Sequence, residues 1–251
     1  MEPALATGYK APPQIARVVT EGWFAKFMYC PACPSPRLEK TRDNTRVVDF
    51  VCANCRAEYQ LKAKAGPLTK RLRDAAYQPM RERVLAGRSP HFVFLLYDRS
   101  QWQVNSLLLV PGHFLTINVI EACPPLRETA RRAGWVGCNI LTEFLPNEGK
   151  VLAVDRGAVC VPSEVRAKWR RFAWLSKETA ETREWTGDVL LCLQRIVERR
   201  FTLEQVYAFQ GELAERHPRN QNIQAKIRQQ LQILRDKGVL NFLGCGTYEL
   251  K

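Results

Sequence analysis

Residues 47–62 read VVDFVCANCRAEYQLK, and this stretch decides the fold. On each side of its Cys-x-x-Cys turn, polar residues alternate with β-branched or aromatic ones, which predicts two short antiparallel strands. A four-residue turn between these strands sets Asp49 opposite Gln60, and directly opposed residues share a face of the sheet. Alternation along the second strand then places Lys62 on that face. The stretch therefore predicts a carboxylate, an amide and an ammonium group on one surface.

Those three side chains suit the hydrolysis of a phosphodiester. Asp and Gln oxygens can bind Mg²⁺, which prefers few protein ligands together with waters and phosphate oxygens. A lysine ammonium can stabilise charge that develops on the phosphate or orient the attacking water. A Lys and an Asp on facing strands also form ordinary surface ion pairs, worth about 0–1 kcal/mol, so spacing alone leaves both interpretations open. The sequence shows no competing catalytic set, because its three histidines lie near no candidate nucleophile and no Gly-rich phosphate loop is present.

A second pattern in the same region is typical of a metal site. Two Cys-x-x-Cys pairs are separated by 18 residues, a spacing by which two tight turns bring four thiolates onto one tetrahedral Zn²⁺. The four candidate ligands are Cys30, Cys33, Cys52 and Cys55. Since protein fills all four positions, the zinc would be structural and would leave no place for a reactive water. Four unrelated buried thiols are the alternative, and the other cysteines, each alone among apolar residues, are expected in the core.

The composition predicts a globular protein, and its positive charge leaves two interpretations open, a surface that binds nucleic acid or a solvated basic face without a partner. Of 251 residues, 46% are hydrophobic and 25% are charged, which suits a sizeable core and argues against disorder. Lys and Arg number 38 against 25 Asp and Glu, and this net charge of +13 favours nucleic acid ahead of an anionic membrane. No apolar stretch is long enough to span a bilayer, and the N-terminal residues do not resemble a secretion signal. We therefore expect a cytoplasmic protein.

A second candidate for DNA contact is an arginine-rich segment. Residues 127–139 read RETARRAGWVGCN and place three arginines next to two glycines and a tryptophan. Arg131 and Arg132 can contact phosphates, and Trp135 can lie against a base or a base methyl group. A tryptophan is as often a core side chain, so both roles stay open for Trp135.

The C-terminal region predicts a separate DNA-binding unit. A linker with a domain boundary near residue 182 is expected, followed by a helix at 187–198. A second helix opens after Thr202, an N-cap with Gln205 at the capping-box position. A third helix is predicted at 222–237, and two short strands follow it. This order is that of a winged helix-turn-helix, whose third helix enters the major groove, rather than of a plain helical bundle. The side chains expected to read base edges are Gln221, Gln224, Arg228 and Gln229.

Four parts of the sequence together resemble a known family. They are the cysteine quartet that encloses Asp49, the pair Leu61-Lys62, residues 130–135 (ARRAGW) and residues 227–237 (IRQQLQILRDK). Over almost its whole length the chain is similar to the DpnI-type methyl-directed restriction endonucleases. The resemblance implies an α/β fold with a PD-(D/E)XK-type nuclease core and zinc site over 1–182, and a C-terminal winged helix domain over 183–251. It also implies type II cleavage of double-stranded DNA at GATC sites that carry N6-methyladenine, with both domains reading the site.

One position departs from the family pattern, which is Asp followed at a distance by Glu-x-Lys. Gln60 stands where the pattern has Glu, and a neutral amide binds Mg²⁺ less tightly than a carboxylate. Our hypothesis is that Glu58, on the same strand face by alternation, or Glu21, from the preceding helical segment, supplies the missing carboxylate. Val48 stands where the superfamily name has Pro, which is of little consequence.

The sequence thus predicts a two-domain α/β nuclease in which Asp49 and Gln60 hold Mg²⁺, Lys62 assists the water and the zinc is structural. Trp135 is the candidate sensor of the adenine methyl group, whose burial is worth only about 1 kcal/mol, so strong discrimination needs several contacts. The expected partner is adenine-methylated double-stranded DNA and no membrane, and we expect a monomer. A nuclease relative that reads methylated DNA without cutting it is the alternative. A transcription regulator would not explain why Asp49 and Lys62 face each other.

Overall fold

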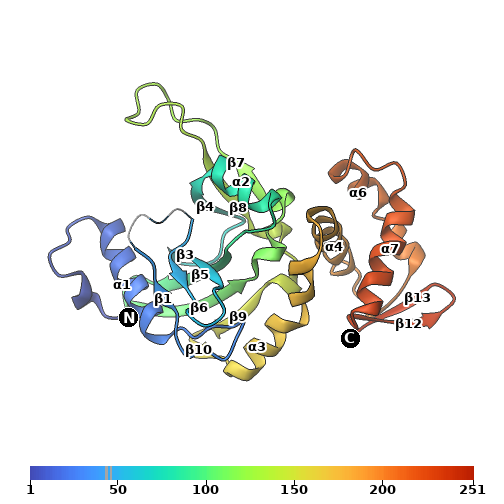
Figure 1. Cartoon of the computed structure of the whole chain (residues 1–251), viewed down its shortest axis with the longest axis horizontal. Coiled ribbons are helices and arrows are strands. Elements are labelled where there is room, and N and C mark those ends of the chain that lie inside the picture. The colour runs from blue at the N-terminus through green and yellow to red at the C-terminus, as the bar shows by residue number, and fades with distance from the viewer. Residues whose placement is uncertain (43–44, 46) are drawn as a thin grey trace.

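The computed structural model describes residues 1–42, 45 and 47–251, and its largest feature is a seven-stranded sheet (Figure 1). The strand order is β1-β2-β3-β5-β6-β9-β10, in which β3 and β5 are parallel and the other neighbouring pairs are antiparallel. The strands are β1 (Glu39–Lys40), β2 (Phe50–Val51), β3 (Glu58–Ala65), β5 (His91–Asp98), β6 (Gln103–Val110), β9 (Val151–Asp155) and β10 (Ala158–Val159).

The central strands are apolar along most of their length because both faces of this sheet are covered. β5 reads HFVFLLYD, and its interior residues are all buried. Its neighbouring residues Val93 and Phe94 belong to different cores, as strand alternation requires. Val93 packs in the core that includes side chains of α1 (Pro12–Phe27) and α3 (Pro162–Arg171), whereas Phe94 packs in the core on the opposite face.

A smaller sheet lies against that second core. It contains β4 (Arg71–Ala76), β8 (Gly137–Leu141) and β7 (Ile120–Ala122), with α2 (Tyr77–Leu85) directly after β4. The connection between β7 and β8, residues 123–136, extends away from the body of the molecule (Figure 1). This projecting connection contains most of the arginine-rich segment that was predicted to contact DNA.

The register predicted between the first two strands is confirmed. Phe50 lies opposite Tyr59, and the same alignment carries on to Asp49 across from Gln60. The first strand is shorter than predicted because Val47 has a φ of 64°, which interrupts the extended chain just before it. The second strand is longer than predicted because its other edge pairs in parallel with β5.

The C-terminal region forms a helical unit with a second three-stranded sheet. Its elements are α4 (Ala180–Leu193), β11 (Arg200–Thr202), α5 (Leu203–Tyr207), α6 (Gln210–Arg216), α7 (Ile223–Asp236), β12 (Leu240–Gly244) and β13 (Thr247–Leu250), with strand order β11-β13-β12. The capping box at Thr202 and Gln205 is confirmed, and so is the third predicted helix, which is α7.

The linker expected near residue 182 is wrong, since the chain there is helical. The Thr179 hydroxyl accepts a hydrogen bond from the Thr182 N–H at 3.1 Å, and this N-cap starts α4 about two turns before the helix that was predicted at 187–198. The helix then ends at Leu193, earlier than expected. The domain boundary itself stays a prediction.

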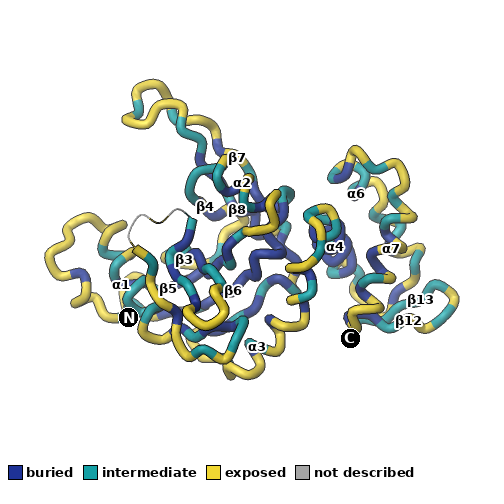
Figure 2. Tube along the Cα trace, in the orientation of Figure 1, coloured by how far each residue is buried: buried dark blue, intermediate teal, exposed yellow. Residues whose placement is uncertain are grey.

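The second core continues from the sheet into the C-terminal unit. Trp185 of α4 and Leu231 of α7 are both buried within it, so α4 joins the two parts (Figure 2). Among the described residues, no helix is both long and apolar enough to cross a membrane. Short 3-10 helices complete the fold, at Pro3–Ala6, Gly112–Phe114, Ile117–Val119, Thr142–Phe144, Asn147–Gly149 and Ala173–Lys177.

Candidate active site

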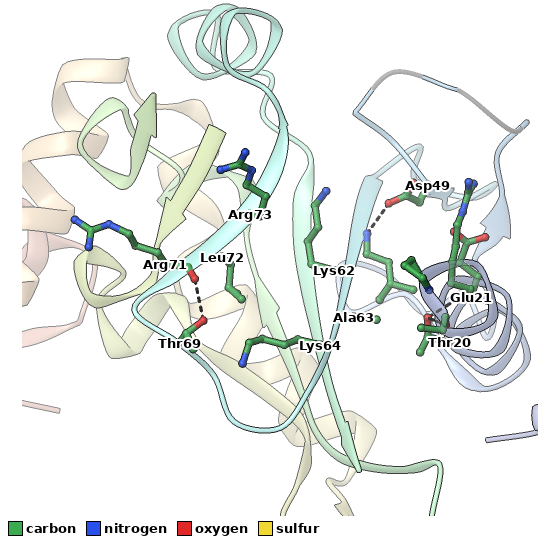
Figure 3. Close-up of a pocket in the computed structure, with 14 residues that line it drawn as sticks. Thr20, Glu21, Asp49, Lys62, Ala63, Lys64, Thr69, Arg71, Leu72 and Arg73 are labelled. Carbon is green, nitrogen blue, oxygen red and sulfur yellow. Dashed lines mark hydrogen bonds and ion pairs between the residues drawn. The ribbon is translucent and has the colours of Figure 1, made fainter. Parts of the chain in front are cut away.

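The site forms where the pairing between β2 and β3 ends. Backbone pairing reaches Tyr59, whose carbonyl accepts the Asp49 N–H at 2.9 Å. The next free amide of β3, Leu61 N–H, then donates to the Asp49 carboxylate at 2.8 Å. This contact fixes the Asp49 side chain just before β2, where it lines a cavity of ≈ 620 Å³ together with Lys62 (Figure 3).

The electrostatics of Asp49 favour a nearby cation. Burial raises the pKa of Asp49 above its ordinary value, while the Leu61 N–H and the Lys62 ammonium act in the opposite direction. The side chain of Glu21 lines the same cavity and raises the pKa of Asp49 further. A carboxylate held in such a place is stabilised in its charged form by any cation that binds beside it.

Gln60 and Lys62 lie on one face of β3, as predicted, and both contact a residue that sequence reasoning missed. The Gln60 amide donates to Asp74 Oδ1 at 2.9 Å, and the Lys62 ammonium lies 2.5 Å from the same oxygen. Asp74 belongs to β4, and its side chain is completely buried. One signal could have found it. Alternation along β4 places Asp74 on the same face as the buried Leu72, where an apolar side chain is expected.

The cavity wall is rich in positive charge. Figure 3 shows Lys62, Lys64, Arg71 and Arg73 around the opening, on the side across from Asp49 and α1. Cationic side chains that converge on a groove of this kind suit the phosphate backbone of a nucleic acid.

The structure also places the two glutamates suggested as extra carboxylates. Glu21 lines the cavity but is paired with Arg17 at 2.6 Å and with Lys40 at 2.9 Å. Glu58 pairs with Arg83 of α2 and does not line the cavity. Both side chains therefore already have cationic partners.

The four predicted cysteine ligands form one cluster. The Sγ atoms of Cys30, Cys33, Cys52 and Cys55 all lie within 4.8 Å of one another. The Cys30–Cys55 and Cys33–Cys52 pairs are 3.6 and 3.5 Å apart, close to the roughly 3.8 Å between thiolates at the corners of a tetrahedron with Zn–S bonds of about 2.3 Å. The cluster could therefore hold a structural zinc.

Neighbouring groups position this cluster. The Arg166 guanidinium of α3 donates to the carbonyls of Cys30 and Cys33 at 3.1 Å each, and the Tyr59 hydroxyl lies 3.2 Å from the Cys30 sulfur. Tyr59 is the residue that precedes Gln60 on β3. The metal-binding lobe and the candidate active site are thus built on the same pair of strands.

In the arginine-rich connection, the Trp135 side chain is neither fully buried nor fully exposed. The Arg132 guanidinium lies 4.6 Å from the centre of the Trp135 ring, which is half-buried next to Gly137 at the start of β8. A Cβ atom at Gly137 would approach that ring to 3.0 Å, so glycine makes room for it. Arg131 and Arg132 are exposed.

The last helix has one buried and one polar side, as predicted. Ile227, Leu231 and Leu234 are fully buried, whereas Gln224, Arg228 and Gln229 are exposed, as is Gln221, which lies before the helix and not on it. The Gln224 amide is not free, since it donates to the side-chain oxygen Oε1 of Gln210 at 2.9 Å. The buried Gln230 accepts a hydrogen bond from Thr186 of α4 at 2.8 Å.

These features define a two-part class of protein, with a mixed α/β unit that carries a four-cysteine cluster and a C-terminal helix-turn-helix unit. Comparison with known protein families identifies the family to which the chain belongs. The model of the DpnI, or Dam-replacing, family matches residues 1–178, and the model of the Dam-replacing HTH domain matches residues 181–250. The chain belongs to the DpnI family. This membership supports a methylation-dependent restriction enzyme, and the helix-turn-helix domain indicates DNA binding.

Proposed function

We propose that this protein is a type II restriction endonuclease that hydrolyses double-stranded DNA at GATC sites carrying N6-methyladenine, with Mg²⁺ as cofactor. One observation carries the proposal: in a chain of the DpnI family, Asp49 and Lys62 converge on one cavity with a basic wall. A phosphate placed in this cavity would meet a carboxylate, an ammonium and several guanidinium groups.

The residues present fit a hard divalent cation. Asp49 offers a carboxylate that lines the cavity, and Gln60, which is buried and does not line it, offers Oε1, an oxygen that has no hydrogen-bond partner among the described residues. Oxygen ligands in small number are what Mg²⁺ prefers in phosphate chemistry. When bound, Mg²⁺ neutralises charge on the phosphate and lowers the pKa of a water. Lys62 stabilises the charge that develops on the scissile phosphate, and Arg71 and Arg73 hold the DNA backbone.

Two regions are proposed to read the DNA. Arg131 and Arg132 contact the backbone while Trp135 lies against the adenine methyl group, in the domain we assign to residues 1–182. The winged helix domain, residues 183–251, presents α7 to the major groove. Its exposed polar residues Gln221, Gln224, Arg228 and Gln229 are proposed to contact base edges.

A non-cutting reader of methylated DNA is the second candidate, and Gln60 is the observation that favours it. The amide removes one negative charge from the position where the family pattern has glutamate. A weaker metal site would slow hydrolysis and leave DNA binding intact.

The test compares one plasmid in two forms, adenine-methylated at GATC and unmethylated, each incubated with the full-length protein and Mg²⁺. Cleavage of the methylated form alone, absent in Lys62→Ala, is the expected result. Tight binding of the methylated form without cleavage in either Mg²⁺ or Mn²⁺ would establish the reader instead. Equal treatment of both plasmids would refute methylation specificity.

A further inference from the structure

A buried carboxylate, Asp74, contacts both Gln60 and Lys62, although no part of the family pattern assigns it a role. We propose that Asp74 supplies the second carboxylate of the divalent-metal site and so takes over the charge that is missing at Gln60. This inference rests on the proposed nuclease function, because it concerns the same site.

The contacts of Asp74 join it directly to the predicted catalytic face. Its Oδ1 accepts from the Gln60 amide at 2.9 Å and lies 2.5 Å from the Lys62 ammonium. Gln60 in turn lies across from Asp49 in the β2–β3 register. Asp49 and Asp74 therefore both contact residues 60–62 of β3, Asp49 through the Leu61 N–H and Asp74 through Gln60 and Lys62.

Two unpartnered oxygens point to a ligand in this place. Gln60 Oε1 and Asp74 Oδ2 are both buried, and neither has a hydrogen-bond partner in the described part of the chain. Each oxygen belongs to a group whose other polar atom makes the Gln60–Asp74 hydrogen bond, so the two groups with an unpartnered oxygen are in direct contact. Buried oxygens are normally satisfied, and a cation bound by both would satisfy them.

The polarity of the Gln60–Asp74 contact also assigns the ligand atoms. Because the carboxylate can only accept, the nitrogen of the Gln60 amide is the atom bonded to Asp74, and the amide oxygen is left for a ligand. The amide thereby contributes a neutral oxygen, whereas Asp74 contributes the charge. Together with Asp49, the site then holds two carboxylates and one amide oxygen, a ligand set typical of Mg²⁺.

The two other candidate carboxylates are matched controls. Glu21 is engaged by Arg17 and Lys40, and Glu58 is engaged by Arg83. Both oxygens of Glu21 contact a cation and the Glu58 side chain is 43% exposed, whereas Asp74 keeps Oδ2 buried and unpartnered among the described residues although Lys62 pairs with its other oxygen. Glu21→Gln and Glu58→Gln should therefore retain metal binding, although each removes one negative charge near the site.

The experiment measures Mn²⁺ binding to the zinc-loaded, full-length protein without DNA, by the electron paramagnetic resonance signal of free Mn²⁺. Asp74→Asn is expected to weaken Mn²⁺ binding about tenfold or more, whereas Glu21→Gln and Glu58→Gln change it less than about threefold. The double variant Gln60→Glu/Asp74→Asn moves the second carboxylate from position 74 to position 60. Its Mn²⁺ affinity should return to near the wild-type value. Cleavage of methylated plasmid should fall and recover in parallel.

Unchanged Mn²⁺ affinity in Asp74→Asn would overturn the inference, because Asp74 would then only position Lys62. The inference would also be overturned if the folded double variant did not recover Mn²⁺ affinity. If wild type cuts methylated DNA and Asp74→Asn cuts equally well, the inference fails while the proposed function stands. If wild type neither binds Mn²⁺ nor cuts, both fail. Should Asp74→Asn not fold, the anomalous signal of Mn²⁺ in wild-type crystals decides, because an ion bound to Asp49 without contact to Asp74 would refute the proposal.

Discussion

Replacing Gln60 by glutamate should destabilise the protein in the absence of a divalent cation and make its stability depend on one. At present the Gln60 amide donates to Asp74 Oδ1 at 2.9 Å, and both side chains are buried. A glutamate of the same shape would place two carboxylates in contact where water cannot reach them. Like charges at such a distance disfavour the ionised pair, so one carboxyl group is expected to keep its proton.

The size of the effect follows from the contact that is lost and from that proton. A hydrogen bond to a charged group is worth about 1.5–3 kcal/mol. Keeping a glutamate with an ordinary pKa of about 4.3 protonated at pH 7.5 costs about 4 kcal/mol, at about 1.4 kcal/mol for each pH unit. A protonated glutamate would itself donate to Asp74, so the two costs are alternatives and do not add, and the free energy of unfolding of Gln60→Glu should fall by about 2–4 kcal/mol at pH 7.5. The raised carboxyl pKa means that the folded state binds the extra proton, so the loss shrinks to about 1.5 kcal/mol at pH 5.5.

The assay is urea unfolding of the zinc-loaded protein at both pH values, with and without Mn²⁺. Mn²⁺ should return most of the lost stability at pH 7.5, because it binds the folded site and neutralises the pair. Gln78→Glu is the matched control, since the Gln78 amide donates to Glu82 at 3.0 Å on the exposed surface of α2, where a like-charge pair costs only about 0.2–0.5 kcal/mol. A loss for Gln60→Glu no larger than for Gln78→Glu, or the same loss at pH 5.5 as at pH 7.5, would refute the reasoning.

Three further predictions follow from other parts of the structure. Cys52→Ser should lower bound zinc well below one per chain and reduce the melting temperature. Cys245 is an exposed thiol outside the cluster, so Cys245→Ser should change neither quantity. Equal zinc content of the two variants by metal analysis would contradict this. Trp135→Ala should reduce the preference for methylated over unmethylated DNA by roughly fourfold, the worth of one buried methyl group at about 0.8 kcal/mol, and competition binding measures the ratio. Burial lowers the pKa of His113 to about 3 and that of His91 to about 4, so the unfolded chain binds more protons below pH 6.5. Stability should therefore be complete above pH 6.5 and fall by up to about 1.4 kcal/mol per pH unit for each histidine down to about pH 4; denaturation midpoints that stay flat from pH 7 to 5 would count against it.

Features written in short stretches of sequence were predictable. The cysteine spacing, the capping box at Thr202 and the register that sets Asp49 opposite Gln60 each depend on a few neighbouring residues, and all three are present in the structure. The start of α4 was missed because the N-cap Thr179 lies upstream of the apolar pattern that marks the helix. Local signals thus predicted the presence of helices and strands more accurately than the residues at which they begin and end.

Asp74 could not be placed from sequence because its role depends on tertiary contacts. β4 pairs with β8, whose residues lie more than sixty positions further along the chain, and that pairing turns Asp74 toward Gln60. A lone aspartate among arginines in residues 71–76 is otherwise typical of a solvated strand. Its complete burial is the property that sequence alone does not reveal and that makes it a candidate ligand.

The two metal sites of this protein are coupled through strand register. Cys52 follows β2 directly, and the turn from Cys52 to Cys55 leads into β3, so a zinc held by these thiolates fixes how the two strands pair. A slip of one residue would turn Gln60 and Lys62 to the opposite face of the sheet, away from Asp74. Soft thiolates select zinc while the oxygen ligands around Asp49 suit a hard cation, so each metal can be exchanged separately. Loss of zinc should therefore abolish Mn²⁺ binding at the second site, even though no cysteine contacts it.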